Sequence, residues 1–189
     1  MPDHFAILAQ PRRPWLDEAG LKDAFHQATT QQHPDVTGGS GDQASALNAA
    51  YAVLRDPAAR LRHLLELEWP GVVSAQAGIA PELADLFGKI AALRQAGAAL
   101  AKKEAAAQSP LARALLAGDR AAQIAALQGV LATLLAAEDA AREEVRAIDA
   151  DWDARDEATR AVLAALQQRL AFLAKWQAQL REDLFRLGE

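Results

Sequence analysis

The C-terminal part of the sequence repeats apolar residues at alternating steps of three and four. The first run lies within residues 81–107, and its members are Leu83, Leu86, Ile90, Leu93, Gly97 and Leu100. Two more runs follow, from Ile124 to about Trp152 and from about Asp153 to Leu187. This period places one apolar stripe on each of three helices. Three such stripes can close into an antiparallel three-helix bundle, which we predict over residues 81–189.

Proline and glycine mark the expected ends of these helices. Ser109-Pro110 should end the first one, with a short helical piece after it, and Gly118-Asp119 should start the second. The leucines of the three stripes are assigned to the core and to no function.

Composition favours helices throughout and narrows the possible chemistry. Hydrophobic residues make up 51% of the chain but aromatic residues only 5%, and alanine is abundant, so small side chains can pack helices closely and we predict no strands. The absence of cysteine excludes disulfides, thiolate zinc sites and cysteine nucleophiles. The four histidines form neither an HxxxH nor an HExxH pattern, so we expect no metal site.

The charge pattern argues against nucleic acid and membrane partners. The net charge is -5, and Lys and Arg are dispersed instead of forming the basic stripe that phosphate binding needs. The N-terminal MPDHFAILAQ lacks the cationic start of a signal peptide, and we see no uninterrupted apolar run close to a membrane span. We therefore expect a soluble cytoplasmic protein.

The first seventy residues predict a helical hairpin. Asp17 can cap a helix with Leu21, Phe25 and Ala28 on one face, which should stop at the His33-Pro34 break. A glycine-rich loop follows, and the next helix, 42–54, has an apolar face formed by Leu47, Ala50, Tyr51 and Leu54. The tripeptide His33-Pro34-Asp35 should then lie at the tip of the hairpin.

Shorter helices flank this hairpin. Phe5 and Leu8 belong to a short helix that Pro11 and Pro14 should stop. Asp56-Pro57 supplies an N-cap and a proline in the first helical position, which opens a helix with Leu61, Leu64 and Leu65 inward. The stretch from Trp69-Pro70-Gly71 to Gly78 is predicted to be a short linker between the two parts of the chain.

Several motifs in this part of the chain carry a family resemblance. The motifs are His33-Pro34-Asp35 between two helices, Asn48-Ala49-Ala50-Tyr51, Leu54-Arg55-x-Pro57-x-x-Arg60 and Leu64-Leu65-x-Leu67. They resemble the J domain of DnaJ-class co-chaperones, and most closely that of HscB (Jac-type) proteins, the J co-chaperones of iron–sulfur cluster assembly. The resemblance implies a J domain at 1–70, a linker at 71–80 and a client-binding helical bundle at 81–189.

The resemblance also implies a docking mechanism. His33, Pro34 and Asp35 would dock on the ATPase domain of a DnaK- or HscA-class chaperone and couple client delivery to ATP hydrolysis. Lys22, Asp56 and Arg60 would belong to the same interface. A purely structural role explains Asp56 and Arg60 equally well: Asp56 can be the N-cap of its helix, and Arg60 can pair with Asp56 across one turn. J domains usually carry several cations on the second helix, whereas 21–32 contains only Lys22.

A second resemblance lies near the C-terminus. The segment Arg169-Leu170-Ala171-Phe172-Leu173-Ala174-Lys175 is similar to the HscB segment whose phenylalanine holds the iron–sulfur scaffold protein. By register, the resemblance implies a client surface that comprises Phe172, Trp176, Phe87, Leu86 and Ile90. The alternative is that these large residues only widen the apolar stripes of their helices.

An enzyme is not expected, because the serines Ser40, Ser45, Ser74 and Ser109 lack a plausible base. No glycine loop matches a phosphate-binding pattern, and we expect no cofactor. We predict a J co-chaperone that delivers an iron–sulfur scaffold to an ATP-driven chaperone. The alternatives are a J protein with another client, and a helical adapter that kept the J fold and lost chaperone stimulation.

Overall fold

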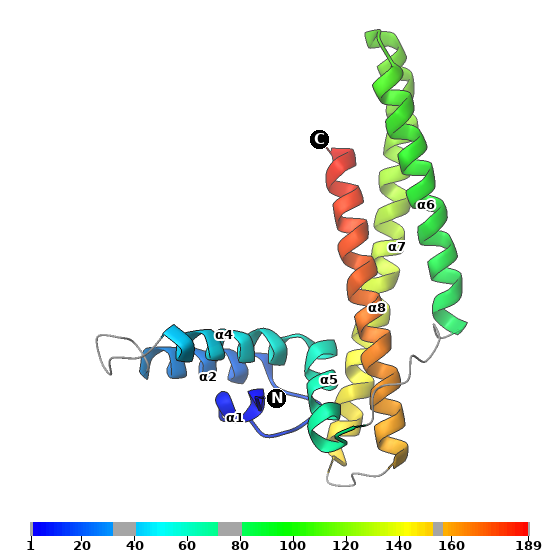
Figure 1. The fold of residues 1–189 in the computed structure, drawn as a ribbon. Helices are drawn as coiled ribbons and strands as arrows, with labels where there is room; N and C mark the ends of the chain where they lie inside the picture. The colour runs from blue at the N-terminus through cyan, green and yellow to red at the C-terminus, as the bar shows by residue number, and fades with distance from the viewer. Residues whose placement is uncertain (1, 32–40, 72–80, 153–156, 189) are drawn as a thin grey trace. The chain divides into compact units, whose positions relative to one another are not determined.

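The computed structural model of the chain describes residues 2–31, 41–71, 81–152 and 157–188. Every regular element within these ranges is an α-helix, which confirms the all-α prediction (Figure 1). The contacts divide the chain into two units, which are described separately below. Unit 1 comprises Met1–Gln76 with Ala141–Ala171, and unit 2 comprises Ala77–Ala140 with Phe172–Glu189.

This division differs from the expected domains, 1–70 and 81–189, because two long helices each extend from one unit into the other. These are α7, Pro110–Ala150, and α8, Glu157–Gly188. Each of them contributes one end to unit 1 and the other end to unit 2. The expected boundary followed the order of the chain, whereas the contacts assign the segment 141–171 to the N-terminal unit.

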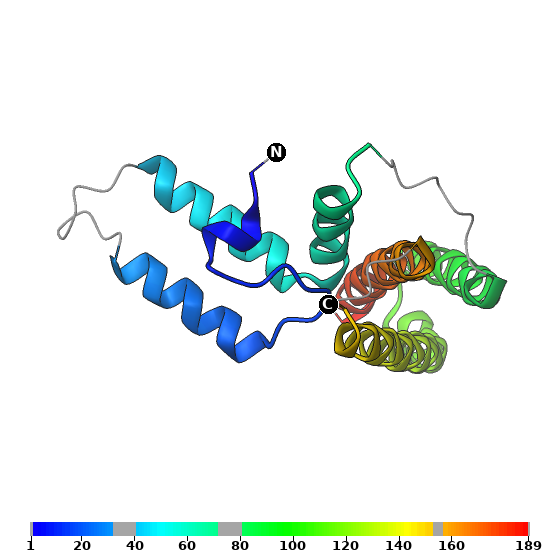
Figure 2. The same ribbon diagram turned by 90° about the horizontal axis from the view of Figure 1, so that it is seen from below.

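Unit 1 contains the predicted hairpin. Its shorter helices are α1 (His4–Ile7), α2 (Glu18–Gln31), α4 (Gly41–Arg55) and α5 (Pro57–Glu68). Helices α2 and α4 lie side by side and antiparallel in both views (Figures 1 and 2). Phe25 of α2 stacks on Tyr51 of α4 with ring centroids 4.4 Å apart, so the predicted apolar faces do meet.

The core of unit 1 joins residues far apart in the sequence. Its fully buried side chains include Phe5, Leu21, Leu54, Leu61, Leu64, Val145 and Leu163. Asp149 near the end of α7 accepts hydrogen bonds from the Arg13 guanidinium and from the backbone N–H of Trp15, the latter at 3.1 Å. The indole Nε1 of Trp152 donates to the carbonyl oxygen of Arg12 at 2.8 Å. These polar contacts fix the N-terminal segment against α7.

Unit 2 contains α6 (Pro81–Ala106), the first part of α7 and the last part of α8. The predicted apolar stripes of the three helices meet in its core. The buried members are Leu83, Ile90, Leu100, Leu127, Leu134, Leu173, Leu180 and Leu187. This burial confirms that the alternating period of three and four residues marks helix packing faces.

The expected break at Gly118 is wrong. Helix α7 runs without interruption from Pro110, and the Ser109 hydroxyl oxygen caps its start by accepting the Ala112 N–H at 3.1 Å. A helical glycine costs about 1 kcal/mol relative to alanine, which the continuous hydrogen-bond ladder outweighs. Nothing in the structure approaches the place where a Cβ of Gly118 would lie, so no close contact requires glycine there. Helix α7 ends at Ala150, and Trp152 lies in the turn beyond it.

Helix α7 also differs from the expectation that no segment is apolar enough to cross a membrane. Among the described helices, α7 alone meets that condition by length and composition, and 11% of its most apolar window is buried. Alanine and leucine dominate this window, in which Leu127 and Leu134 face the core of unit 2.

Candidate functional site

The predicted docking tripeptide, His33-Pro34-Asp35, lies outside the described residues. The helices on either side of it are described: α2 ends at Gln31 and α4 begins at Gly41. Thr29 and Thr30 donate their hydroxyl hydrogens to the carbonyl oxygens of Phe25 and His26 in the last turns of α2. The tripeptide therefore connects the adjacent ends of two paired antiparallel helices, and its docking role stays a prediction.

The two residues of α5 that were predicted at the interface have structural partners. Asp56 is the N-cap, and its carboxylate accepts the backbone N–H groups of Ala58 at 2.9 Å and Ala59 at 3.1 Å. These bonds satisfy two of the backbone donors that lack a partner within the helix, and Pro57 at the first helical position has no N–H to satisfy. Capping therefore accounts for Asp56 without a partner protein.

Arg60 is a core residue of unit 1, with 2% of its surface exposed. Its Nε and Nη1 atoms donate to the carbonyl oxygens of Pro14 and Leu54, both at 2.9 Å. Burial, together with the nearby charge of Arg142, lowers the pKa of Arg60 to about 10, so the guanidinium is still cationic at neutral pH. This geometry favours the structural reading, and direct contact with a partner is not expected.

The predicted client residues of unit 2 divide into an aromatic cluster and a core. The rings of Phe87 and Trp176 are 6.1 Å apart, and those of Phe172 and Trp176 are 5.9 Å apart. Phe87 is 50% exposed, whereas Trp176 is 4% exposed and Ile90 is 3% exposed. Phe172 and Leu86 are partly buried against the same core.

The inclusion of Trp176 and Ile90 in the client surface therefore needs correction. Both side chains are held in the core of unit 2, because their positions on α8 and α6 face the interior of the bundle. Phe87 is the exposed member of the aromatic cluster, and the ring of Phe172 lies beside the buried ring of Trp176. The burial of Trp176 and Ile90 fits the core reading, and a client role of Phe87, Phe172 and Leu86 stays a prediction.

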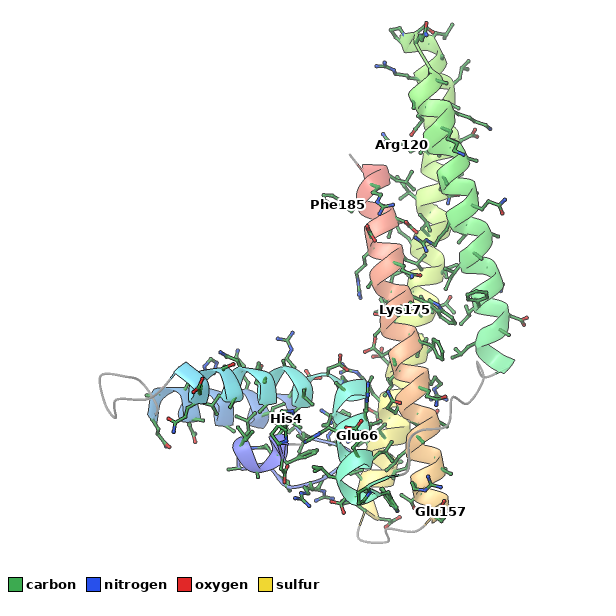
Figure 3. All side chains as sticks on the ribbon, in the orientation of Figure 1. His4, Glu66, Arg120, Glu157, Lys175 and Phe185 are labelled. Atoms are coloured by element: carbon green, nitrogen blue, oxygen red, sulfur yellow. The ribbon has the colours of Figure 1, made fainter. Side chains whose placement is uncertain are left out.

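Sequence reasoning missed the long-range polar contacts of unit 1. His63 is buried, and its Nε2 accepts the backbone N–H of His4 at 3.0 Å, with the two rings 4.5 Å apart (His4 is labelled in Figure 3). Arg142 of α7 pairs with Glu18 of α2 at 2.8 Å. No spacing motif predicts such contacts, because the partners are 59 and 124 residues apart.

No protein-family model matches the chain. A co-chaperone HscB homologue of Burkholderia vietnamiensis is 39% identical over 72 residues, which cover 34% of this chain and 41% of the relative. The chaperone protein DnaJ of Caulobacter vibrioides is 43% identical over 63 residues, which cover 32% of this chain and 16% of that protein. The matched segment thus spans less than half the length of either relative.

The fold similarity extends over almost all of the chain. The solved structure of the chaperone HscB from Vibrio cholerae covers 98% of this chain and 99% of its own, with a TM-score of 0.58 and 19% sequence identity. At this identity the likeness establishes the fold. About a third of the chain is therefore similar in sequence to HscB and DnaJ co-chaperones, and almost the whole chain shares the fold of HscB.

Proposed function

We propose that this protein stimulates ATP hydrolysis by a DnaK- or HscA-class chaperone and delivers an iron–sulfur scaffold protein to it. The observation that carries the proposal is the sequence His33-Pro34-Asp35 between the paired helices α2 and α4. A turn needs proline and glycine but neither histidine nor aspartate, so a docking role explains the composition of the tripeptide. The Asp35 carboxylate can bind a basic residue of the chaperone.

A single-turnover ATPase assay tests the chaperone part of the proposal. The DnaK- and HscA-class chaperones of the source organism are each loaded with ATP and mixed with wild-type protein, His33→Gln or Asp35→Asn. The wild type should accelerate hydrolysis by at least one of them, and both variants should lose the acceleration. His26→Gln on α2 and Asp42→Asn on α4 are matched controls, because both residues are exposed on the same hairpin.

The results of this assay distinguish a J co-chaperone from a helical adapter. If the wild type accelerates neither chaperone, the protein is not a J co-chaperone, and the adapter reading replaces the proposal. If His33→Gln and His26→Gln reduce the rate equally, the tripeptide is not the docking element.

The aromatic cluster of Phe87, Phe172 and Trp176 supports the client part of the proposal. An exposed aromatic ring beside a partly buried one is a suitable anchor for a partner surface, because aromatic residues dominate binding hot spots. Phe87 is 50% exposed and lies on α6, and Phe172 lies on α8, so a client would contact two helices of unit 2.

Titration calorimetry with the purified iron–sulfur scaffold tests this part. Phe87→Ala and Phe172→Ala should each weaken binding by about 10-fold or more, as expected for aromatic anchors. Phe185→Ala is the matched control, because Phe185 is also on α8, is 68% exposed and points away from the helix (Figure 3). Equal affinities of all three variants would exclude the cluster as the client site and favour a different client.

A further inference from the structure

Helix α7 has a second apolar stripe, on the side that faces away from the core of unit 2. The members of this stripe follow one another at strictly alternating steps of four and three residues, and each of them is exposed. We call them the outer stripe: Leu111, Leu115, Gly118, Ala122, Ala125, Gly129, Ala132 and Ala136. The same alternation marks the buried faces of the helices in this unit. It is typical of a helix that packs along another helix.

The leucines of the outer stripe are largely exposed. Leu111 is 71% exposed and Leu115 is 74% exposed, and Leu135, which flanks the stripe, is 40% exposed. Single leucines are common on protein surfaces, but these three lie on one side of one helix, and no member of the stripe is charged. A helix side that meets only water usually carries charged residues. Within the described part of the chain, the outer stripe is therefore a helix face without a packing partner.

The sizes of the side chains change along the outer stripe. Its leucines lie near the start of α7, whereas its second half contains only alanine and glycine. If two copies of α7 pack antiparallel about a two-fold axis, each leucine of one copy meets a small residue of the other. The facing pairs are then Leu111 with Ala136, Leu115 with Ala132, Gly118 with Gly129, and Ala122 with Ala125. In a parallel pair leucine would meet leucine and glycine would meet glycine, which packs unevenly.

The residues beside the outer stripe fit the same antiparallel pairing. Asp119 is the charged residue next to the stripe, and in the antiparallel pair it faces Ala126 of the other copy. Leu135 faces Ala114, so a third leucine also meets a small side chain. The neighbouring Arg120 is paired with Glu104 of α6 at 3.5 Å. The pairing therefore brings no like charges together along the stripe, and such charges would oppose self-association.

The length of the outer stripe determines how strong such an association can be. Two helices in contact over about 38 Å bury on the order of 1,000 Å² in total. This area is at the lower limit of specific interfaces, so we expect a dissociation constant of about 10 to 100 μM. We propose that the outer stripe pairs two copies of this chain into an antiparallel dimer. The dimer is independent of the proposed function, because the outer stripe includes neither the His-Pro-Asp tripeptide nor the aromatic cluster.

A lipid surface is a poorer occupant of the outer stripe. Helices that lie on membranes bury Trp, Phe or Leu and place Lys and Arg beside them. The second half of the outer stripe offers only alanine and glycine, and the charged residue beside the stripe is an aspartate. Small residues instead let two helices approach to an axis distance of about 8 Å. A second helix therefore fits this surface better than lipid does.

Sedimentation equilibrium of the full-length protein over about 1 to 500 μM tests the dimer. The wild type should pass from monomer to dimer within this range. Ala125→Glu places carboxylates beside the two-fold axis and should raise the dissociation constant by about 10-fold or more. Ala178→Glu is the matched control, because Ala178 is an exposed alanine of α8 and the substitution adds the same charge. Glutamate is a good helix former, so both variants should keep the wild-type circular dichroism.

Three results would overturn the dimer. The first is a wild type that stays monomeric at the highest concentration or forms assemblies larger than a dimer. The second is an equal dissociation constant for Ala125→Glu and Ala178→Glu. The third is a monomeric wild type that floats with vesicles of phosphatidylcholine and phosphatidylserine, which would assign the outer stripe to a lipid surface.

Disulfide cross-linking tests the antiparallel register, because the chain has no cysteine of its own. No atom lies within 4 Å of the place where a Cβ would lie at Gly118 or Gly129, so both positions accept a cysteine. In the antiparallel dimer these two positions face each other, whereas the two copies of Gly118 lie about 16 Å apart along the helices, which is too far for a disulfide.

A mixture of Gly118→Cys and Gly129→Cys, one of them tagged so that the products separate on a gel, is treated with oxidised glutathione. The mixed dimer should form about 10-fold faster or more than the cross-linked dimer of either variant alone. Faster cross-linking of each variant with itself would indicate a parallel pair and would contradict the proposal.

Discussion

Replacing Arg60 with alanine distinguishes a structural role of this residue from a docking role. The guanidinium makes two hydrogen bonds of 2.9 Å to buried carbonyl oxygens, those of Pro14 and Leu54. Hydrogen bonds from charged donors contribute about 1.5 to 3 kcal/mol each, and truncation also leaves a cavity in unit 1. We expect Arg60→Ala to reduce the free energy of unfolding by about 3 to 5 kcal/mol, a large part of the usual total.

Urea unfolding followed by circular dichroism measures this loss. Arg60→Lys keeps the charge but cannot reach both carbonyls with a planar fork, so its loss should be intermediate. Arg62→Ala is the matched control on α5, and it should cost less than about 0.5 kcal/mol because its ion pair with Glu66 is exposed. If Arg60→Ala is as stable as Arg62→Ala and binds the chaperone more weakly, Arg60 is a docking residue and the structural reading is refuted.

Three further predictions concern stability. Burial lowers the pKa of His63, so His63 takes up a proton more readily in the unfolded chain than in the folded protein. The free energy of unfolding should therefore fall as the pH decreases below about 6.5. Unfolding curves at several pH values should show that His63→Phe weakens this pH dependence. Asp56→Ala removes the cap of α5 and should cost about 0.5 to 2 kcal/mol in urea unfolding, and a change near zero would contradict the capping role. Leu134→Ala should cost about 2 to 5 kcal/mol because Leu134 is fully buried, whereas Phe185→Ala should be nearly neutral; equal melting temperatures would contradict the packing of unit 2.

The helices of the J-domain part could be predicted because local signals mark their ends. Asp56 and Pro57 fix the start of α5 through a cap and a missing donor, and both effects depend only on neighbouring residues. The buried positions of α6 and α8 could also be predicted, because the period of the apolar residues indicates which side of a helix is buried. Such signals need no knowledge of the tertiary structure.

The predictions from the sequence differed from the structure where tertiary contacts determine the course of a helix or the burial of a side chain. Gly118 gives a local break signal, but the hydrogen-bond ladder of α7 continues through it. Trp176 lies beside the stripe of α8, and only the packing of Phe87 and Phe172 around it shows that it is buried. The grouping of segment 141–171 with the N-terminal unit depends on Asp149 and its partners far along the chain, which no local pattern reveals.

The measurement that tests the account most directly is the single-turnover rate of ATP hydrolysis by the chaperone at saturating concentrations of this protein. The account predicts that the wild type accelerates hydrolysis, and that His33→Gln gives the rate of the chaperone alone. An unaccelerated rate with the wild type, or full acceleration with His33→Gln, would contradict the claim that this chain acts as a J co-chaperone through its His-Pro-Asp tripeptide.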